Sequence, residues 1–126
     1  MKARAVNKYI RHSAKKMKPM LDMVRGKQVN TVLNMLAYMP KKSAKIVELT
    51  TRSAVSNLLN TDEGAKINTD ELLILEAYAD QGPVMKRIRP RSMGRAYLIR
   101  KRSCHLTIVV GTAPAEDVIK DTKEKE

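Results

Sequence analysis

Residues 82–110 read GPVMKRIRPRSMGRAYLIRKRSCHLTIVV, and this stretch decides the fold. It lies within a longer window, from Gln81 to Ala115, that contains no Asp or Glu. The window holds eight cations, which are Lys86, Arg87, Arg89, Arg91, Arg95, Arg100, Lys101 and Arg102. Cations without counter-charges repel one another in a free protein, so we expect this segment to face a dense polyanion.

The flanks of the basic segment predict that it forms an extended arm. Cys104–Val110 alternates aliphatic residues as a strand does, and Leu72–Ala79 is a second strand rich in aliphatic and aromatic residues. The two strands pair most simply as a hairpin, but they are separated by far more than the roughly two to five residues of an ordinary hairpin turn. We therefore expect a long arm that reverses at Gly94, with a tip on the order of 40 Å beyond Gly82 if both limbs are extended.

The chain before these strands predicts an edge strand followed by helices. Ala3–Arg11 mixes β-branched and aromatic residues with cations, which favours an edge strand with charged faces. Ser13 is a suitable N-cap for a helix that ends at Gly26, although Pro19 indicates a later start or distorted first turns. Two further helices are expected, a short one at Val29–Leu36 and the longest one from Pro40 to about Asn60.

Composition indicates one small domain with a polyanionic partner. The chain has 126 residues, with 25 Lys and Arg against 13 Asp and Glu and a net charge of +12, so nucleic acid is the default partner. A lone cysteine, Cys104, excludes an internal disulfide, and with only His12 and His105 available there is no zinc framework. No aliphatic run approaches the roughly 20 residues of a membrane helix, and no secretory signal is visible. We expect no cofactor, no metal and no membrane partner.

The chemistry of the arm favours RNA. Arg outnumbers Lys six to two among its cations, and the planar guanidinium fits phosphate oxygens. The sequence shows no helix-turn-helix, zinc-finger spacing or basic zipper of the kinds that enter the DNA major groove. Folded RNA is recognised largely by shape, phosphates and 2′-hydroxyls, which a basic arm can contact. A DNA-compacting architectural protein is the alternative among binding proteins.

Catalysis is the competing class of function. His12 beside Ser13, and His105 beside Cys104, could each pair a base with a nucleophile, but adjacent residues on a strand point to opposite faces. Neither pair predicts an active site, and His105 is interpreted as a structural or RNA-facing imidazole. An enzyme would require turnover that is lost when His12 or His105 is replaced by Ala.

Four stretches, in this order, resemble the large-subunit ribosomal protein twenty-two family of bacterial type. They are VRGKQV (24–29), MPKKSAKIVELTTRSAVSNLLN (39–60), ELLILEAYADQGP (71–83) and the arm sequence 82–110. The resemblance implies an α+β fold in which three helices pack on a three-stranded antiparallel sheet and a long β-hairpin protrudes. We expect one domain, 1–126, with a globular part at about 1–82 and 103–112, a hairpin arm at about 83–102 and a flexible tail at about 113–126.

The resemblance also implies a structural constituent of the large ribosomal subunit that binds large-subunit rRNA, aids assembly and lines the nascent-peptide exit tunnel with its hairpin. Such a protein would be cytoplasmic and would meet rRNA, neighbouring ribosomal proteins and the nascent polypeptide, without forming a homo-oligomer. The implied rRNA contacts are the eight arm cations together with Arg11, Ser13, Lys15, Lys16, Lys18, Arg25, Lys27 and His105. The implied tunnel tip comprises Pro90, Arg91, Ser92, Met93, Gly94, Arg95 and Ala96.

Three positions depart from the family pattern. Ser92-Met93 stands before the tip glycine where relatives usually have Ala-Arg, so a cation is replaced by an apolar side chain. Ser103-Cys104 stands before the histidine where relatives usually have Thr-Ser, and Ser56 stands where Ala is typical. None of these changes is expected to alter the fold, but the first changes the chemistry of the tip.

Overall fold

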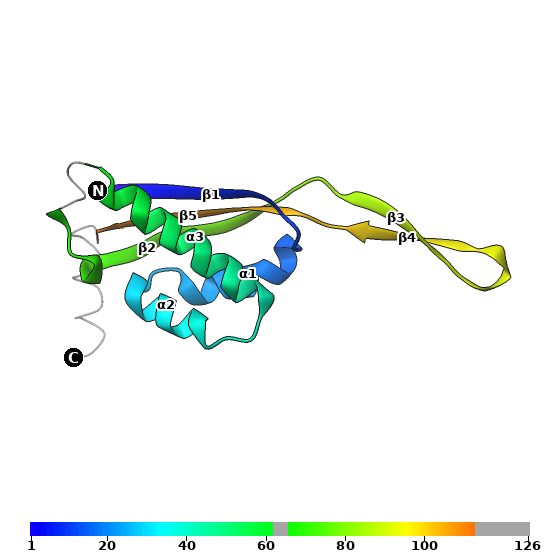
Figure 1. Cartoon of the computed structure of the whole chain (residues 1–126), viewed down its shortest axis with the longest axis horizontal. Helices are drawn as coiled ribbons and strands as arrows, with labels where there is room; N and C mark the ends of the chain where they lie inside the picture. Colours follow the sequence, from blue (N-terminus) through cyan, green and yellow to red (C-terminus); the bar gives the residue numbers. More distant parts are fainter. Residues whose placement is uncertain (62–65, 113–126) are drawn as a thin grey trace, which may run out of the picture.

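Three helices lie against a three-stranded antiparallel sheet, and a separate two-stranded ribbon extends from one end of it (Figure 1). The structure is a computed structural model that describes residues 1–61 and 66–112. It confirms the predicted α+β fold class, in which the helices pack against antiparallel strands. The sheet has the order β1-β5-β2 and the ribbon pairs β3 with β4. The strands are β1 (Lys2–Ile10), β2 (Leu72–Gln81), β3 (Met85–Pro90), β4 (Ala96–Lys101) and β5 (Cys104–Thr112).

The central strand, β5, supplies one face of the core. Leu106, Ile108 and Val110 have no exposed surface, and their alternation places them on the same face of the sheet. β5 pairs with an antiparallel partner on each side, so that Ile108 lies opposite Ala5 of β1 and Ala77 of β2. The predicted edge position of the N-terminal strand is therefore confirmed, because β5 is the only neighbour of β1 among the described strands.

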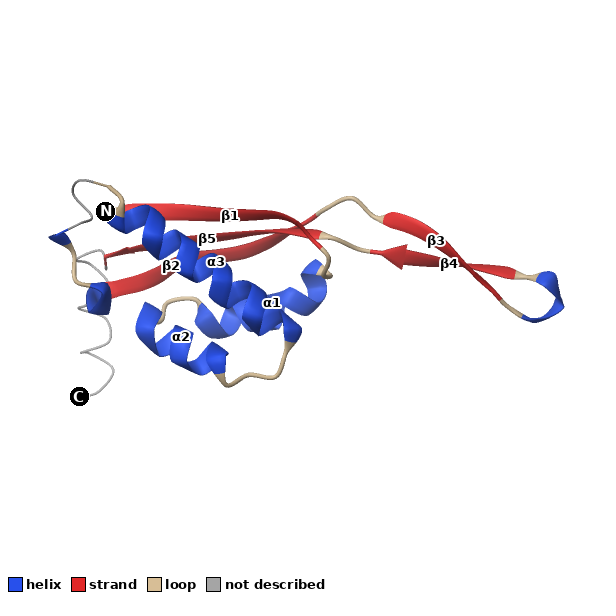
Figure 2. Ribbon diagram, in the orientation of Figure 1, coloured by secondary structure: helices blue, strands red, loops and turns tan. Residues whose placement is uncertain are grey.

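The helices, drawn in blue in Figure 2, bury the apolar stripes that their spacing predicts. The residues of these stripes recur at intervals of three, four or seven positions, which place them on one helix face. Among the helices of residues 1–61 and 66–112, none has the length and apolar character needed to cross a membrane. The helices are α1 (Ala14–Val24), α2 (Val29–Ala37) and α3 (Lys42–Leu59), and their buried apolar residues include Met17, Met20, Leu21 and Val24 of α1 and Ala44, Val47, Ala54 and Leu58 of α3.

The turn after α1 is fixed to the sheet. Gly26 adopts a left-handed backbone with φ of 77°, which glycine accepts without steric cost. Its N–H donates to the Ile74 carbonyl at 2.8 Å, and the Ile74 N–H donates to the Lys27 carbonyl at 3.0 Å. These two bonds hold the α1–α2 turn against β2, so helix α1 begins at the base of the ribbon and runs along the sheet away from it.

Two small residues of β5, Gly111 and Cys104, lie where the structure around the strand is closely packed. A side chain at Gly111 would collide with the Met1 carbonyl and with Leu75, so only glycine lets β1 and β2 approach β5 at this position. Cys104 is fully buried, and this burial raises the pKa of its thiol. A buried neutral thiol is a poor nucleophile, which agrees with a structural role for Cys104. The tail expected at 113–126 lies outside the described residues.

Candidate nucleic-acid interface

The hairpin arm is a regular ribbon closed by a tight tip. β3 and β4 pair without interruption from Met85 opposite Lys101 to Pro90 opposite Ala96. The tip is a single turn at Ser92–Gly94, in which the Arg91 N–H donates to the Arg95 carbonyl at 2.7 Å. Met93 and Gly94 both have left-handed backbones, with φ of 59° and 66°, and the Met93 side chain is 92% exposed. The chain thus reverses where the sequence predicts.

Neither face of the arm is apolar throughout, and cations occur on both. Arg87 lies opposite Ile99 and Arg89 opposite Tyr97, whereas Ile88 lies opposite Leu98 on the other face. That second face also places Lys86 directly opposite Arg100, an arrangement that is destabilising when nothing neutralises it. All eight predicted arm cations are exposed. An isolated two-stranded ribbon is marginal in water, so this arm has the composition of a segment that is stabilised by a partner.

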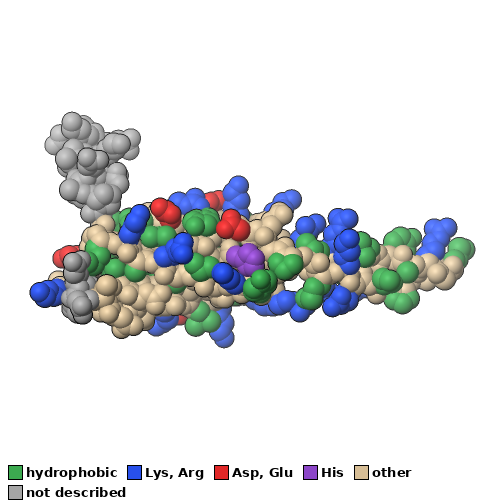
Figure 3. Space-filling model, turned by 90° about the horizontal axis from the view of Figure 1, so that it is seen from above, with side chains coloured by type: hydrophobic (Ala, Val, Ile, Leu, Met, Phe, Trp, Pro, Cys, Tyr) green, Lys and Arg blue, Asp and Glu red, His purple; other side chains and the backbone are tan. Residues whose placement is uncertain are grey.

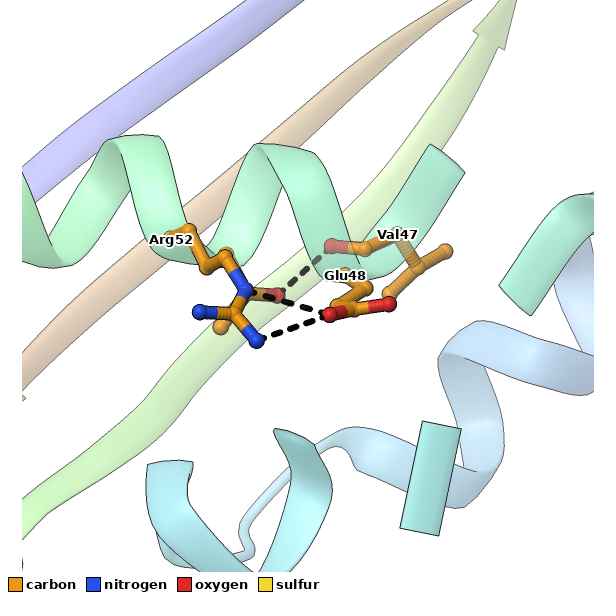
Figure 4. Close-up of polar contacts among 4 residues, drawn as sticks. Val47, Glu48 and Arg52 are labelled. Carbon is orange, nitrogen blue, oxygen red and sulfur yellow. Dashed lines mark hydrogen bonds and ion pairs between the residues drawn. The ribbon is translucent and has the colours of Figure 1, made fainter. Parts of the chain in front are cut away.

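Among the residues that the structure describes, no arm cation forms an ion pair with a carboxylate. Within residues 1–61 and 66–112, ion pairs are formed only by Arg25 with Asp22 at 3.1 Å and by Arg52 with Glu48 at 2.9 Å. Figure 4 shows the second pair on α3, next to the hydrogen bond from the Thr51 hydroxyl to the Val47 carbonyl. Figure 3 shows the acidic side chains over the globular part, while basic and hydrophobic side chains continue along the arm. The arm is therefore the part of this surface with uncompensated positive charge.

The globular end of the arm borders a basic hollow of about 670 Å³. It brings together predicted contacts from distant parts of the sequence, because Arg11, Ser13 and Lys16 lie with the last residues of the arm. Its full lining is Arg11, His12, Ser13, Lys16, Lys42, Arg100, Lys101 and Arg102. We name this site the root hollow. A second hollow of about 300 Å³ shares Ser13 and Arg102 with it and adds Lys15 beside Gly82.

Lys42 belongs to the root hollow but was not among the predicted contacts. A sequence signal for it exists, since Lys42 is the first residue of the longest helix and a cation there opposes the positive end of the helix dipole. His12 also lines the root hollow. The sequence suggests it only as a possible catalytic base, but in the structure its Nδ1 donates a hydrogen bond to the Ser13 carbonyl at 3.2 Å.

The remaining predicted N-terminal contacts are placed apart from the root hollow. Lys15, Lys18 and Arg25 line a groove between α1 and β2. Arg25 is already engaged, because its guanidinium donates to Asp22 at 3.1 Å and to the Ala77 carbonyl at 2.6 Å. This side chain therefore connects the end of α1 to β2, whereas the family resemblance implies that it contacts rRNA. Lys27 lies in the exposed turn between α1 and α2.

His105 holds an irregular part of β1. The Tyr9 backbone N–H donates to His105 Nδ1 at 3.0 Å, and the two rings pack edge to face with centroids 4.8 Å apart. Tyr9 has a left-handed backbone with φ of 56°, at a point where the β1–β5 register shifts between Asn7 and Ile10. Aromatic residues adopt this conformation rarely, so the contacts to His105 compensate a local strain. In the part of the chain that the structure describes, no three His, Cys, Asp or Glu side chains form a metal-binding group.

Comparison with known proteins gives one consistent result. Residues 5–111 match the family described as ribosomal protein L22p/L17e. The large ribosomal subunit protein uL22 of Halothermothrix orenii is 44% identical over 110 residues, which cover 87% of this chain and 95% of the relative. The uL22 protein of Clostridium novyi is 46% identical over 110 residues, with coverages of 87% and 96%. That of Caldicellulosiruptor saccharolyticus is 44% identical over 109 residues, with coverages of 86% and 87%.

Proposed function

The chain belongs to the ribosomal protein L22p/L17e family, and from this premise we propose that it binds large-subunit rRNA through its hairpin arm and the root hollow. Members of this family are structural, non-enzymatic proteins of the large ribosomal subunit, which is cytoplasmic in bacteria. The protein is therefore a component of that subunit and works beside rRNA and other ribosomal proteins. Direct rRNA binding, assistance in assembly and a tunnel position are the finer proposals.

The observation that carries the proposal is the uncompensated charge of the arm. Its eight cations are exposed, and none of them takes part in an ion pair within residues 1–61 and 66–112. Six are arginines, whose guanidinium groups can make two parallel hydrogen bonds to a phosphate. A ribbon with charge on both faces can contact phosphates on two sides at once, which is suited to insertion between RNA helices. The eight arm cations and Arg11, Ser13, Lys15, Lys16, Lys18 and Lys27 are the proposed contacts, with Arg25 and His105 also performing structural roles.

The tip is proposed to line the path of the nascent polypeptide. Met93 is almost fully exposed, although apolar side chains are usually covered, and it stands at the farthest turn of the arm. An exposed thioether among arginines offers a soft apolar contact to a passing chain. The proposed tip comprises residues 90–96, and the protein is proposed to act as a single copy.

Sedimentation of the native protein through a gradient at moderate salt tests the proposed function. We expect comigration with large ribosomal subunits, and we expect the protein to bind protein-free large-subunit rRNA more tightly than random duplex DNA at the same salt. Equal affinity for both would favour the DNA-compacting alternative. Recovery only as free protein would refute the subunit assignment. For the tip, a photo-crosslinking residue at position 93 should label a stalled nascent chain, whereas one at exposed Asn34 of α2 should not.

A further inference from the structure

The arm and the globular part are two bodies with a short connection between them. The hydrogen-bonded ladder of the sheet ends at Gln81 opposite Cys104, and that of the arm begins at Met85 opposite Lys101. Across the gap, the Gly82 N–H donates to the Ser103 carbonyl at 2.9 Å and the Ser103 hydroxyl donates to the Pro83 carbonyl at 2.6 Å. Within the described residues, β3 and β4 pack on each other and make no substantial contact with a helix or with the sheet. The direction of the arm therefore depends on what occupies its base.

The root hollow lies across this connection and takes its cations from both bodies. The globular part contributes Arg11, Lys16 and Lys42, and the arm contributes Arg100, Lys101 and Arg102. Of the residues that the structure describes, no Asp or Glu lines it. While the hollow is empty, the two sets of like charges repel each other, and this repulsion tends to turn the arm away from the globular part. A polyanion in the hollow reverses the sign of the interaction, because each body is then attracted to the same ligand.

The polarity of two helices favours the same ligand. α1 and α3 both begin at the arm end of the globular part (Figure 1), and Lys16 and Lys42 fall in their first turns. Neither helix has an acidic residue in its first turn or a side-chain cap. A cation beside a helix N-terminus is unfavourable alone, whereas an anion there is stabilised by the helix dipole and by free backbone N–H groups. The volume of about 670 Å³ exceeds that of a lone phosphate group.

We propose that the root hollow is a phosphate clamp: neighbouring phosphates of one RNA backbone bind there to cations of both bodies and so fix the direction of the arm. This inference rests on the proposed function, since the ligand is the RNA that the arm also contacts. The inference goes beyond the proposed function because it assigns to the root hollow the role of fixing the direction of the arm. The cations of the outer arm supply affinity, whereas those of the root hollow convert binding into a single arm orientation.

Spin labels on the tip and on the globular part measure that orientation. Met93→Cys and Asn34→Cys provide exposed labelling sites, and the native Cys104 is left in place because it is fully buried. Pulsed electron paramagnetic resonance then gives the distribution of tip-to-α2 distances for the full chain, free and with saturating protein-free large-subunit rRNA. We expect a broad distribution in the free protein and a narrow one in the complex.

Variants separate the clamp from general RNA binding. Lys16→Gln with Lys42→Gln removes two globular cations of the root hollow, and both residues are exposed, so the fold is retained and a urea midpoint checks it. The matched control, Lys2→Gln with Lys66→Gln, removes the same charge from exposed positions outside the hollow. We expect the Lys16→Gln, Lys42→Gln protein to bind rRNA at saturation but to keep a broad distribution of tip-to-α2 distances. The control protein should show the same narrow distribution as the parent when rRNA is bound.

Each outcome has a distinct meaning. If the distance distribution of the Lys16→Gln, Lys42→Gln protein narrows on rRNA binding as the parent's does, the clamp proposal is wrong and the proposed function is unaffected. If random duplex DNA narrows the distance distribution of the parent as much as rRNA does, the assignment of RNA as the ligand of the root hollow is wrong. Failure of the parent to bind rRNA at all would overturn the proposed function itself.

Discussion

At the scale of single residues, His105 illustrates a side chain whose position in the sequence fits two roles. Its Nδ1 accepts the Tyr9 N–H and its ring packs against the Tyr9 ring, so the imidazole supports the irregular end of β1. We expect His105→Ala to lower the free energy of unfolding by about 1–2 kcal/mol, from the lost hydrogen bond and the lost ring contact. Urea unfolding followed by circular dichroism measures this loss.

The control for this prediction is Tyr9→Phe, which keeps the backbone N–H and the ring. It should unfold close to the parent. If His105→Ala instead retained parental stability and weakened rRNA binding, the imidazole would be an RNA contact and its structural role would be wrong.

Residue roles could be predicted from the sequence only where they depend on near neighbours. The arm cations were identified because acids are absent around them. The pair of Asp22 and Arg25 could also be read from its spacing, but the second bond of Arg25, to the Ala77 carbonyl, joins residues 52 positions apart. The left-handed backbone of Tyr9 could not be predicted either, since it is a rare state for this residue type and follows from the β1–β5 register.

At the scale of elements, the connection between sheet and arm includes one side-chain hydrogen bond, which the Ser103 hydroxyl donates to the Pro83 carbonyl. A side chain at Gly82 would approach Ser103 Oγ to 2.6 Å, and that oxygen is already bonded to the Pro83 carbonyl. We expect Ser103→Ala to broaden the tip-to-α2 distances of the free protein, because this cross-link of the two limbs is lost. The cost to the stability of the core should be at most about 1 kcal/mol, since water can reach the exposed Pro83.

Ser103→Thr provides the rescue for this experiment, because it restores the hydroxyl that Ala lacks. Ser92→Ala, at the tip, is the matched control and should leave the distances unchanged. Parental distances in Ser103→Ala would show that the backbone bond from Gly82 to Ser103 alone sets the arm.

The elements themselves were predicted well because their signals are local. The longest helix was expected from Pro40 to about Asn60 and spans Lys42–Leu59, since its apolar stripe is continuous. Pro19 was expected to delay or distort α1, yet the helix begins at Ala14 with Ser13 as its N-cap. The break between the two ladders falls at residues 82–84, which include Pro83, a residue without a backbone N–H to donate, but the hollow beside it was not predicted. That hollow requires the helix starts of residues 14 and 42 to meet residue 102, which is a consequence of packing.

At the scale of the whole molecule, charge is distributed unevenly along the long axis. The arm carries cations without acids, while the ion pairs of the described residues lie at the end of α1 and on α3. If about six arm cations each neutralise a phosphate, the logarithm of the rRNA affinity should fall against the logarithm of salt concentration with a slope of roughly −4 to −5. Arg87→Gln with Arg89→Gln should make this slope shallower by about 1 to 2, because two phosphate contacts are removed.

Filter binding over a range of salt concentrations measures both slopes. Lys2→Gln with Lys66→Gln serves again as the control of equal charge and should change the slope less. A nearly flat salt response of the parent protein would contradict phosphate binding by the arm.

The central place of β5 has a consequence for how the protein is made. β1 and β2 have no hydrogen bonds to each other in the sheet, and both depend on Cys104–Thr112, which the synthesising ribosome releases after the whole arm. Until then the aliphatic sides of both strands have no partner, and long-range pairing of this kind forms slowly. The sheet can close only after synthesis has passed residue 112. A nascent chain therefore exposes its basic arm before its core can fold, and we expect that the proposed assembly with RNA can begin on a protein that is still folding.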